Sequence, residues 1–217
     1  MILFENVSKT FGKDKVLFDN VDLLIPSRLR IGIVGEAGSG KSTLLKLIAG
    51  SELPTRGTIH RSKGKLLWSD GTMQVMHPNM TLYQGLRFFG RLYSDEDEEM
   101  ERILHEILEF SGTMEYRNVL WKDIPARLRP TLKFAMMSEV DVEYLLIEGA
   151  LMPPNNDKTL SERLKRKMKK STTFYTSPNL KQIEENCDAG IVLHQKGLHY
   201  FDNVRDAIEF HQKEIKK

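Results

Sequence analysis

The 217-residue chain has a single cysteine, Cys187, and no apolar run long enough to cross a bilayer. One thiol cannot form an intrachain disulfide, and a cysteine-based metal site would lack its second ligand. The first ten residues, MILFENVSKT, also lack the basic start and long apolar core of a secretory signal. These absences predict a protein of the reducing cytosol that neither spans a membrane nor is secreted.

An excess of charge of one sign is missing as well. The sequence has 32 basic and 30 acidic residues, for a net charge of +2, and this balance predicts no nucleic-acid partner. Its six histidines do not show the spacing with glutamate that marks helical zinc sites, so we expect no histidine metal site. With 40% hydrophobic and 29% charged residues, the chain has the composition of a globular protein and the length of a single domain.

The first half of the chain predicts strands followed by a helix. Residues 1–11, 16–26 and 29–34 have strand character, and the last of them ends at a glycine-rich turn. A helix is predicted over 42–49, because the run favours helix and Gly50 follows it as a C-terminal glycine. Glycines divide residues 51–76, which we expect to return as strands and complete a small β-subdomain.

Helical and strand patterns alternate in the rest of the chain. Apolar residues at helical spacing predict helices within 81–110, where the acidic run 95–99 suits a solvated helix N-terminus. Apolar runs at 144–147, 172–176 and 189–193 predict buried strands of a parallel sheet. A helix over 160–170 carries one strongly basic face. We interpret this face as solvent-exposed, and contact with acidic lipid or a polyanionic substrate is the alternative.

The most specific motif lies between strand 31–34 and the first helix. Here the sequence GEAGSGKST contains the pattern G-x-x-x-x-G-K-S, in the strand–loop–helix context that the pattern's mechanism requires. Glycines let backbone N–H groups turn toward a polyphosphate, and the helix N-terminus adds positive potential. Lys41 is expected to reach the β- and γ-phosphates, the Ser42 hydroxyl to ligate Mg²⁺, and Thr43 to extend toward the α-phosphate. The loop therefore predicts binding of ATP with Mg²⁺ by Gly35, Gly38, Ser39, Gly40, Lys41, Ser42 and Thr43.

The order of segments resembles the nucleotide-binding subunits of ABC transporters, and among them the small ATPases of capsular polysaccharide exporters. The segments that carry this resemblance are FENVSKTF, VLFDNVDLLIPS, GEAGSGKSTLLKLIAG, LPTRGTI, FFGRLY, YLLIE and CDAGIVL. It implies an α/β P-loop NTPase fold of the ABC type, with a mostly parallel sheet core and an N-terminal antiparallel β-subdomain. It also implies that residues 1–217 form a single nucleotide-binding domain, with a helical subdomain at about 80–140.

The resemblance also assigns residues outside the phosphate loop. Phe11 takes the place of the family's aromatic residue that stacks on adenine, with a core aromatic as the alternative. The family's glutamine loop falls near His77, or at Gln74 if the loop is shifted. The aspartate loop falls on 153–157, where Asn155 or Asp157 is the nearest equivalent.

The sequence departs from the family at its catalytic positions. The signature should lie near 123–129, where DIPARLR contains no Ser-Gly pair. The metal-binding aspartate corresponds to Glu148, and the glutamate that positions water corresponds to Gly149, which has no side chain. A shift by one residue would make Glu148 the base and put Ile147 at the metal position. The switch histidine falls on Pro178, which has no side-chain donor or acceptor.

The resemblance implies a degenerate ATPase that binds ATP while hydrolysis is slow or absent. It would form a dimer with itself or with a related ATPase subunit, and would bind a membrane permease at the cytoplasmic face of the cell membrane. One alternative is a nucleotide-binding regulatory or scaffold protein without a transport role. Another is a small P-loop kinase, in which Arg117, Arg127 and Arg129 would serve as lid residues.

Overall fold

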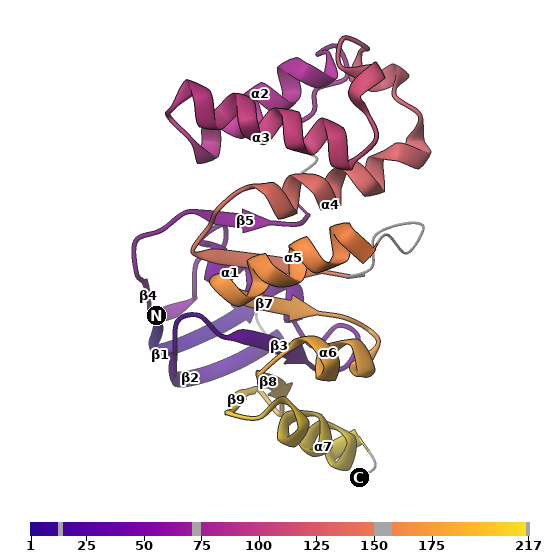
Figure 1. The fold of residues 1–217 in the computed structure, drawn as a ribbon. Coiled ribbons are helices and arrows are strands. Elements are labelled where there is room, and N and C mark those ends of the chain that lie inside the picture. The colour runs from indigo at the N-terminus through magenta and orange to yellow at the C-terminus, as the bar shows by residue number, and fades with distance from the viewer. Residues whose placement is uncertain (13–14, 71–74, 150–157, 216–217) are drawn as a thin grey trace. The chain divides into compact units, whose positions relative to one another are not determined.

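The structure is a computed structural model that describes residues 1–12, 15–70, 75–149 and 158–215. Its contacts group the chain into two compact units, which we describe separately (Figure 1). Unit 1 comprises residues 1–66, 143–149 and 168–217, and unit 2 comprises residues 67–142 and 150–167.

An antiparallel sheet formed by the N-terminal residues belongs to unit 1. It contains β1 (Ile2–Phe11), β2 (Lys15–Ile25) and β4 (Arg56–Arg61), in the order β2-β1-β4. In the register, Ile2 lies opposite Ile25 on one side and Arg61 on the other. Ile2, Phe4 and Ile25 are fully buried, which explains why this end of the sheet holds its register. The predicted N-terminal β-subdomain is thus confirmed.

A second sheet, of six strands, has the order β5-β6-β7-β3-β8-β9. Its strands are β3 (Arg30–Val34), β5 (Leu66–Trp68), β6 (Tyr144–Glu148), β7 (Thr172–Thr176), β8 (Ala189–His194) and β9 (Gly197–Phe201). Strands β6, β7, β3 and β8 are parallel, and β9 is antiparallel to β8. The expected mostly parallel core is confirmed. One expectation for residues 51–76 is wrong, because β5 joins this sheet instead of the N-terminal one.

Among its described residues, unit 1 includes the helices α1 (Lys41–Ala49), α6 (Leu180–Asn186) and α7 (Val204–Ile215). Helix α1 begins immediately after the glycine-rich loop and ends at Gly50, whose φ of 78° is the left-handed conformation expected of a C-terminal glycine. Helix α7 packs on β8, β3 and β9. The strand that leads into the phosphate loop is therefore supported by the C-terminal helix.

The helices of unit 2 are α2 (Leu82–Tyr93), α3 (Asp97–Phe110), α4 (Arg129–Glu139) and the part of α5 (Lys158–Lys170) that ends at Lys167. Three short 3₁₀ turns separate α3 from α4: η1 (Met114–Tyr116), η2 (Trp121–Asp123) and η3 (Ala126–Leu128). Helix α2 starts at a capping box in which Thr81 and Gln84 bond to each other's backbone N–H. Helix α3 has Asp97, Glu98 and Glu99 in its first turn, so the predicted role of the acidic run as a helix start is confirmed.

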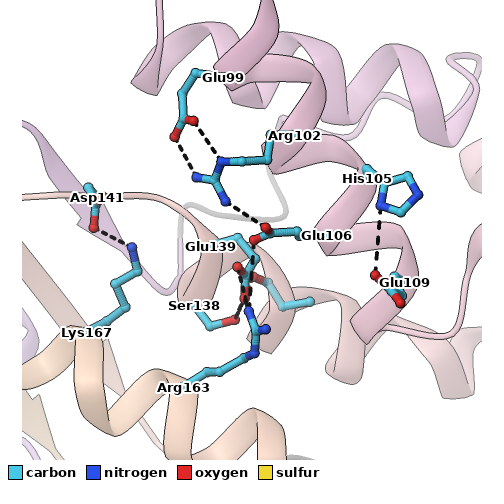
Figure 2. A network of polar contacts seen from close by, with 11 residues as sticks. Glu99, Arg102, His105, Glu106, Glu109, Ser138, Glu139, Asp141, Arg163 and Lys167 are labelled. Carbon is cyan, nitrogen blue, oxygen red and sulfur yellow. Dashed lines mark hydrogen bonds and ion pairs between the residues drawn. The ribbon is translucent and has the colours of Figure 1, made fainter.

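A network of charged groups links α3, α4 and α5 inside unit 2 (Figure 2). Arg163 Nη1 donates to both carboxylate oxygens of Glu139 at 3.0 Å, and Lys167 pairs with Asp141. Burial raises the pKa of Glu139, whereas a hydrogen bond with Glu139 lowers that of Glu106. The basic face of α5 is therefore only partly free, since Arg163 and Lys167 serve the fold.

Among the described residues, no helix combines the length and the apolar character needed to cross a bilayer.

Candidate nucleotide-binding site

The phosphate loop runs from the end of β3 to the start of α1 in unit 1. Within it, Lys41 Nζ donates to the backbone oxygens of Gly35 at 2.7 Å and of Glu36 at 2.6 Å. Burial lowers the pKa of Lys41, and the nearby Glu36 carboxylate opposes that shift. The loop thus holds one ammonium group at the N-terminus of a helix, where both the charge and the backbone N–H groups favour an anion.

Gly40 shows why the loop needs glycine. Its φ is 101°, a conformation that residues with a side chain rarely adopt. A Cβ atom at this position would also lie 1.7 Å from Leu17 Cδ2. Both observations explain why the chain enters α1 through a glycine at this position.

Two hydroxyl groups of the loop are placed differently. Ser42 Oγ donates to Glu148 Oε1 at 2.6 Å, which joins the loop to the last residue of β6. Ser39 Oγ is sealed from solvent and has no hydrogen-bond partner among the residues that the structure describes. The structure therefore brings together Ser42 and Glu148, the two residues that the sequence nominated as metal ligands, and leaves one buried polar atom of the loop unsatisfied.

A cavity of about 430 Å³ opens beside Lys41. Its lining includes Lys41, Glu148, Gly149, Pro178 and His211. Gly149 and Pro178, which the resemblance leads us to expect at catalytic positions, therefore line the same cavity as the ammonium group and the carboxylate. Neither contributes a polar side-chain atom there.

Sequence reasoning missed His211. It lies on α7 and is 7% exposed, one turn after the buried residues Ala207 and Ile208. With Val204, these residues form the spacing i, i+3, i+4 and i+7 that predicts the core-facing stripe of a helix. The sequence signal for this residue is a histidine at the last position of an otherwise apolar helical stripe.

A second cavity, of about 300 Å³, lies against the phosphate loop and also includes His211. Glu36 and Ser39 line it from the loop, and His194 and Glu214 line it from β8 and α7, with His194 Nε2 3.4 Å from Glu214 Oε2. His211 therefore lines both cavities, each of which also includes residues of the phosphate loop.

Phe11 ends β1 with a side chain that is 40% exposed. The ammonium group of Lys9 lies 4.9 Å from the centre of its ring. The alternative that Phe11 is a core aromatic is therefore wrong, and its role toward a nucleotide base stays a prediction.

Other predicted positions belong to unit 2 or fall outside the described residues. His77 is exposed in unit 2, where its Nδ1 accepts from Asn79 N at 3.3 Å. The segment 123–129 forms part of η2, then η3, and the start of α4, with the Arg129 guanidinium 4.7 Å from the Trp121 ring. Gln74 and the segment 153–157 with Asn155 and Asp157 fall outside the described residues.

The class of protein follows from this fold and loop together with a family comparison. A model of the ABC transporter family matches residues 18–130, and the chain belongs to that family. The ABC ATPase domain binds nucleotide and generally uses Mg²⁺. Membership decides against the small P-loop kinase, for which Arg117, Arg127 and Arg129 were candidate lid residues.

Three relatives match this chain over nearly its whole length. The polysialic acid transport ATP-binding protein KpsT of Escherichia coli is 29% identical over 99% of this chain and 100% of its own. The capsule polysaccharide export ATP-binding protein CtrD of Neisseria meningitidis serogroup B is 27% identical over 97% and 98%. The ATP-binding protein BexA of Haemophilus influenzae is 28% identical over 97% and 98%. The predicted similarity to capsule-export ATPases is confirmed.

Solved structures support the fold independently. An ATP-binding subunit of an ABC transporter covers 100% of both chains with a TM-score of 0.73 and 18% identity. An ATP-binding cassette solved as a dimer in a post-hydrolysis state with ADP and Pi covers 94% of this chain and 99% of its own, with a TM-score of 0.70 and 18% identity. The predicted fold class is therefore confirmed.

Proposed function

We propose that this chain is the ATP-binding subunit of an exporter of polysaccharide, and that it binds MgATP while hydrolysing it slowly or not at all. The observation that carries the proposal is the composition of one cavity. Lys41 and Glu148, two groups that serve binding, line it together with Gly149 and Pro178, which cannot serve hydrolysis.

The described residues fit a magnesium nucleotide. Ser39 Oγ is a buried polar atom that lacks a partner among them, and the contact between Ser42 and Glu148 offers the oxygen donors that Mg²⁺ prefers. When bound, Mg²⁺ neutralises charge on the β- and γ-phosphates. Lys41 adds a second positive charge from the loop, and Ser42 and Glu148 would hold the metal. This arrangement supports Glu148 as the metal-side carboxylate, since it accepts a hydrogen bond from Ser42, the serine that would ligate the ion.

Slow hydrolysis follows from the groups that this cavity does not supply. Gly149 has no side chain to orient or deprotonate water, and Pro178 has none to contact the terminal phosphate. Loss of a catalytic base typically costs about 10² to 10⁴ in rate. Losing several cooperating groups should not cost much more than losing the first, because such groups act as a unit. Binding, which relies on the loop, is expected to survive.

The proposed assembly follows the relatives' names and the resemblance. We expect a dimer of this chain, or a pair with a related ATPase subunit, bound to a membrane permease at the cytoplasmic face of the cell membrane. Phe11 is proposed to stack on adenine, because its ring is partly exposed at the end of β1. Gly35, Gly38, Gly40 and Thr43 complete the proposed phosphate cradle.

Calorimetry tests the proposal directly. Mg·ATP titrated into the wild-type chain should release or absorb heat with saturation below millimolar nucleotide, and Lys41→Ala should abolish that signal. Adding EDTA should weaken ATP binding if Ser42 and Glu148 hold Mg²⁺. An absence of binding to the wild type at millimolar Mg·ATP would refute the proposal. If the chain binds ATP but a pull-down recovers no membrane partner, the regulatory alternative is favoured.

A further inference from the structure

The cavity beside Lys41 contains an imidazole that none of the predicted motifs provides. His211 reaches this cavity from α7, which packs on β8, β3 and β9. By contrast, Pro178, at the position where the family has its switch histidine, offers no donor or acceptor to the same cavity. The histidine expected after β7 is therefore missing, and a different histidine, on α7, lines the cavity.

The place of His211 on its helix suggests more than packing. Val204, Ala207 and Ile208 form the buried stripe of α7, and an apolar residue at 211 would complete it without a desolvation cost. His211 is nearly as buried, yet no hydrogen bond ties its ring to another of the described residues. It therefore keeps donor capacity at the point where α7 meets the phosphate loop.

The charges of the cavity indicate what this donor would meet. Of the residues that line the cavity, Lys41 and His211 are the two whose side chains can carry positive charge. A triphosphate held by Lys41 places its terminal phosphate on this side of the loop. Glu148, also in the lining, would repel a free anion there unless Mg²⁺ lies between them.

We infer that His211 donates a hydrogen bond to the terminal phosphate of the bound nucleotide, taking the place of the side chain that Pro178 lacks. The inference rests on the proposed MgATP site and assigns one further nucleotide-contacting residue to it. This contact would make the affinity of the site depend on the presence of the γ-phosphate. It does not restore a general base at Gly149.

The electrostatic surroundings are compatible with this role. Burial lowers the pKa of His211, the Glu36 carboxylate opposes the shift, and Lys41 and His194 add to it. The ring is therefore neutral at neutral pH and retains one N–H donor. A phosphate approaching from the cavity would favour the protonated ring, which strengthens the contact further.

The test compares a non-hydrolysable ATP analogue with ADP, both with Mg²⁺, by calorimetry. His211→Leu preserves the apolar packing of α7 and removes the donor. It should therefore lower the affinity for the triphosphate analogue about tenfold and leave the affinity for ADP unchanged. His211→Gln keeps an N–H donor and should recover part of the loss. His194→Leu is the matched control, because His194 lines only the other cavity, and it should leave the ratio of the two affinities unchanged.

Two outcomes would overturn the inference. Equal weakening of both nucleotides by His211→Leu would show that the ring only supports the loop, and no change in either affinity would show that the ring does not contact the nucleotide. Melting curves establish that each variant is folded. If the wild type binds neither nucleotide, the proposed function itself fails, whereas binding by the wild type with no selective loss in His211→Leu refutes this inference alone.

Discussion

Gly149 has free space for a side chain but a backbone conformation that favours glycine. Its φ is 93°, and a Cβ atom there would meet nothing within 4 Å. A side chain therefore has room, but residues other than glycine pay about 1 to 2 kcal/mol for this left-handed conformation. A glutamate, which the resemblance leads us to expect at this position, could be accommodated only with backbone strain or a local rearrangement.

Gly149→Ala should therefore lower the free energy of unfolding by about 1 kcal/mol and leave any residual ATP turnover unchanged, because glycine has no catalytic side chain to lose. Chemical denaturation and phosphate release measure the two effects. Gly112→Ala is the control, since Gly112 has a φ of 64° and equally open space but lies in unit 2. A large drop in turnover with Gly149→Ala, absent in the control, would show that the acidic positions are wrongly placed.

The residues of the phosphate loop could be predicted because they are contiguous in sequence and each has a mechanical reason to be there. Glu148 could be placed only relative to a family pattern, and its contact with Ser42 depends on β6 lying close to the loop. His211 was not found, since only the return of α7 to β3 brings it to Lys41. Local patterns do not encode such distant contacts.

At the scale of elements, α3 offers a test of the predicted acidic start. Glu98 lies in its first turn and Glu109 near its end, and both are exposed. Glu98→Gln should lower the free energy of unfolding by about 0.3 to 1 kcal/mol, because its negative charge interacts favourably with the positive end of the helix dipole. Chemical denaturation at low salt measures the change.

The matched control is Glu109→Gln, which removes the same charge at the opposite end of α3. There the carboxylate faces the negative end of the dipole, so its removal should be neutral or stabilising. Its interaction with His105, whose Nδ1 lies 3.8 Å from Glu109 Oε2, is exposed and contributes little. Equal destabilisation by both substitutions would contradict the dipole explanation.

Element types were predicted more reliably than element partners. The burial of each segment is visible in its own sequence. It appears as apolar residues at helical spacing in α2 and α3, and as short apolar runs in β6, β7 and β8. Strand β5 was assigned to the wrong sheet because a strand of three residues carries no information about its neighbour. The residues of α4 fall within the predicted helical subdomain, but no separate helix was predicted there, although Pro130 suits the first turn of a helix.

For the whole molecule, the ion pair between Arg30 and Asp188 predicts a response to pH. Arg30 Nε donates to Asp188 Oδ2 at 2.9 Å and the backbone N–H of Arg30 to the same oxygen at 3.1 Å, and the side-chain bond is the main reason that the pKa of Asp188 lies below its ordinary value. A carboxylate whose pKa is lower in the folded chain stabilises it above the unfolded pKa of about 4, and this contribution is lost as the pH falls through the folded pKa.

Asp188→Asn should therefore lower the free energy of unfolding at pH 7 by about 0.5 to 1 kcal/mol, a range reduced because the pair is partly exposed. The difference from wild type should shrink as the pH drops below about 4. Urea denaturation across pH 3 to 7 provides the measurement. Asp70→Asn, at an exposed carboxylate with no ion pair among the described residues, should show little difference at any pH. A constant loss for Asp188→Asn would exclude an ionic origin.

The contacts within the chain define two units. The prediction of a single domain over 1–217 with a helical subdomain at about 80–140 stays a prediction, whereas the contacts assign residues 67–142 and 150–167 to unit 2. The early part of α5 joins that unit through Arg163, which binds Glu139 of α4. A basic run in the sequence does not reveal which of its cations are used inside the fold.

The burial of Cys187 has a practical consequence. This thiol is buried in unit 1, and desolvation raises its pKa to about 12, so it stays protonated and poorly nucleophilic at neutral pH. A cysteine introduced at an exposed position would be the single readily alkylated group. Fluorophores could then be attached at one chosen residue without first removing the native sulfhydryl.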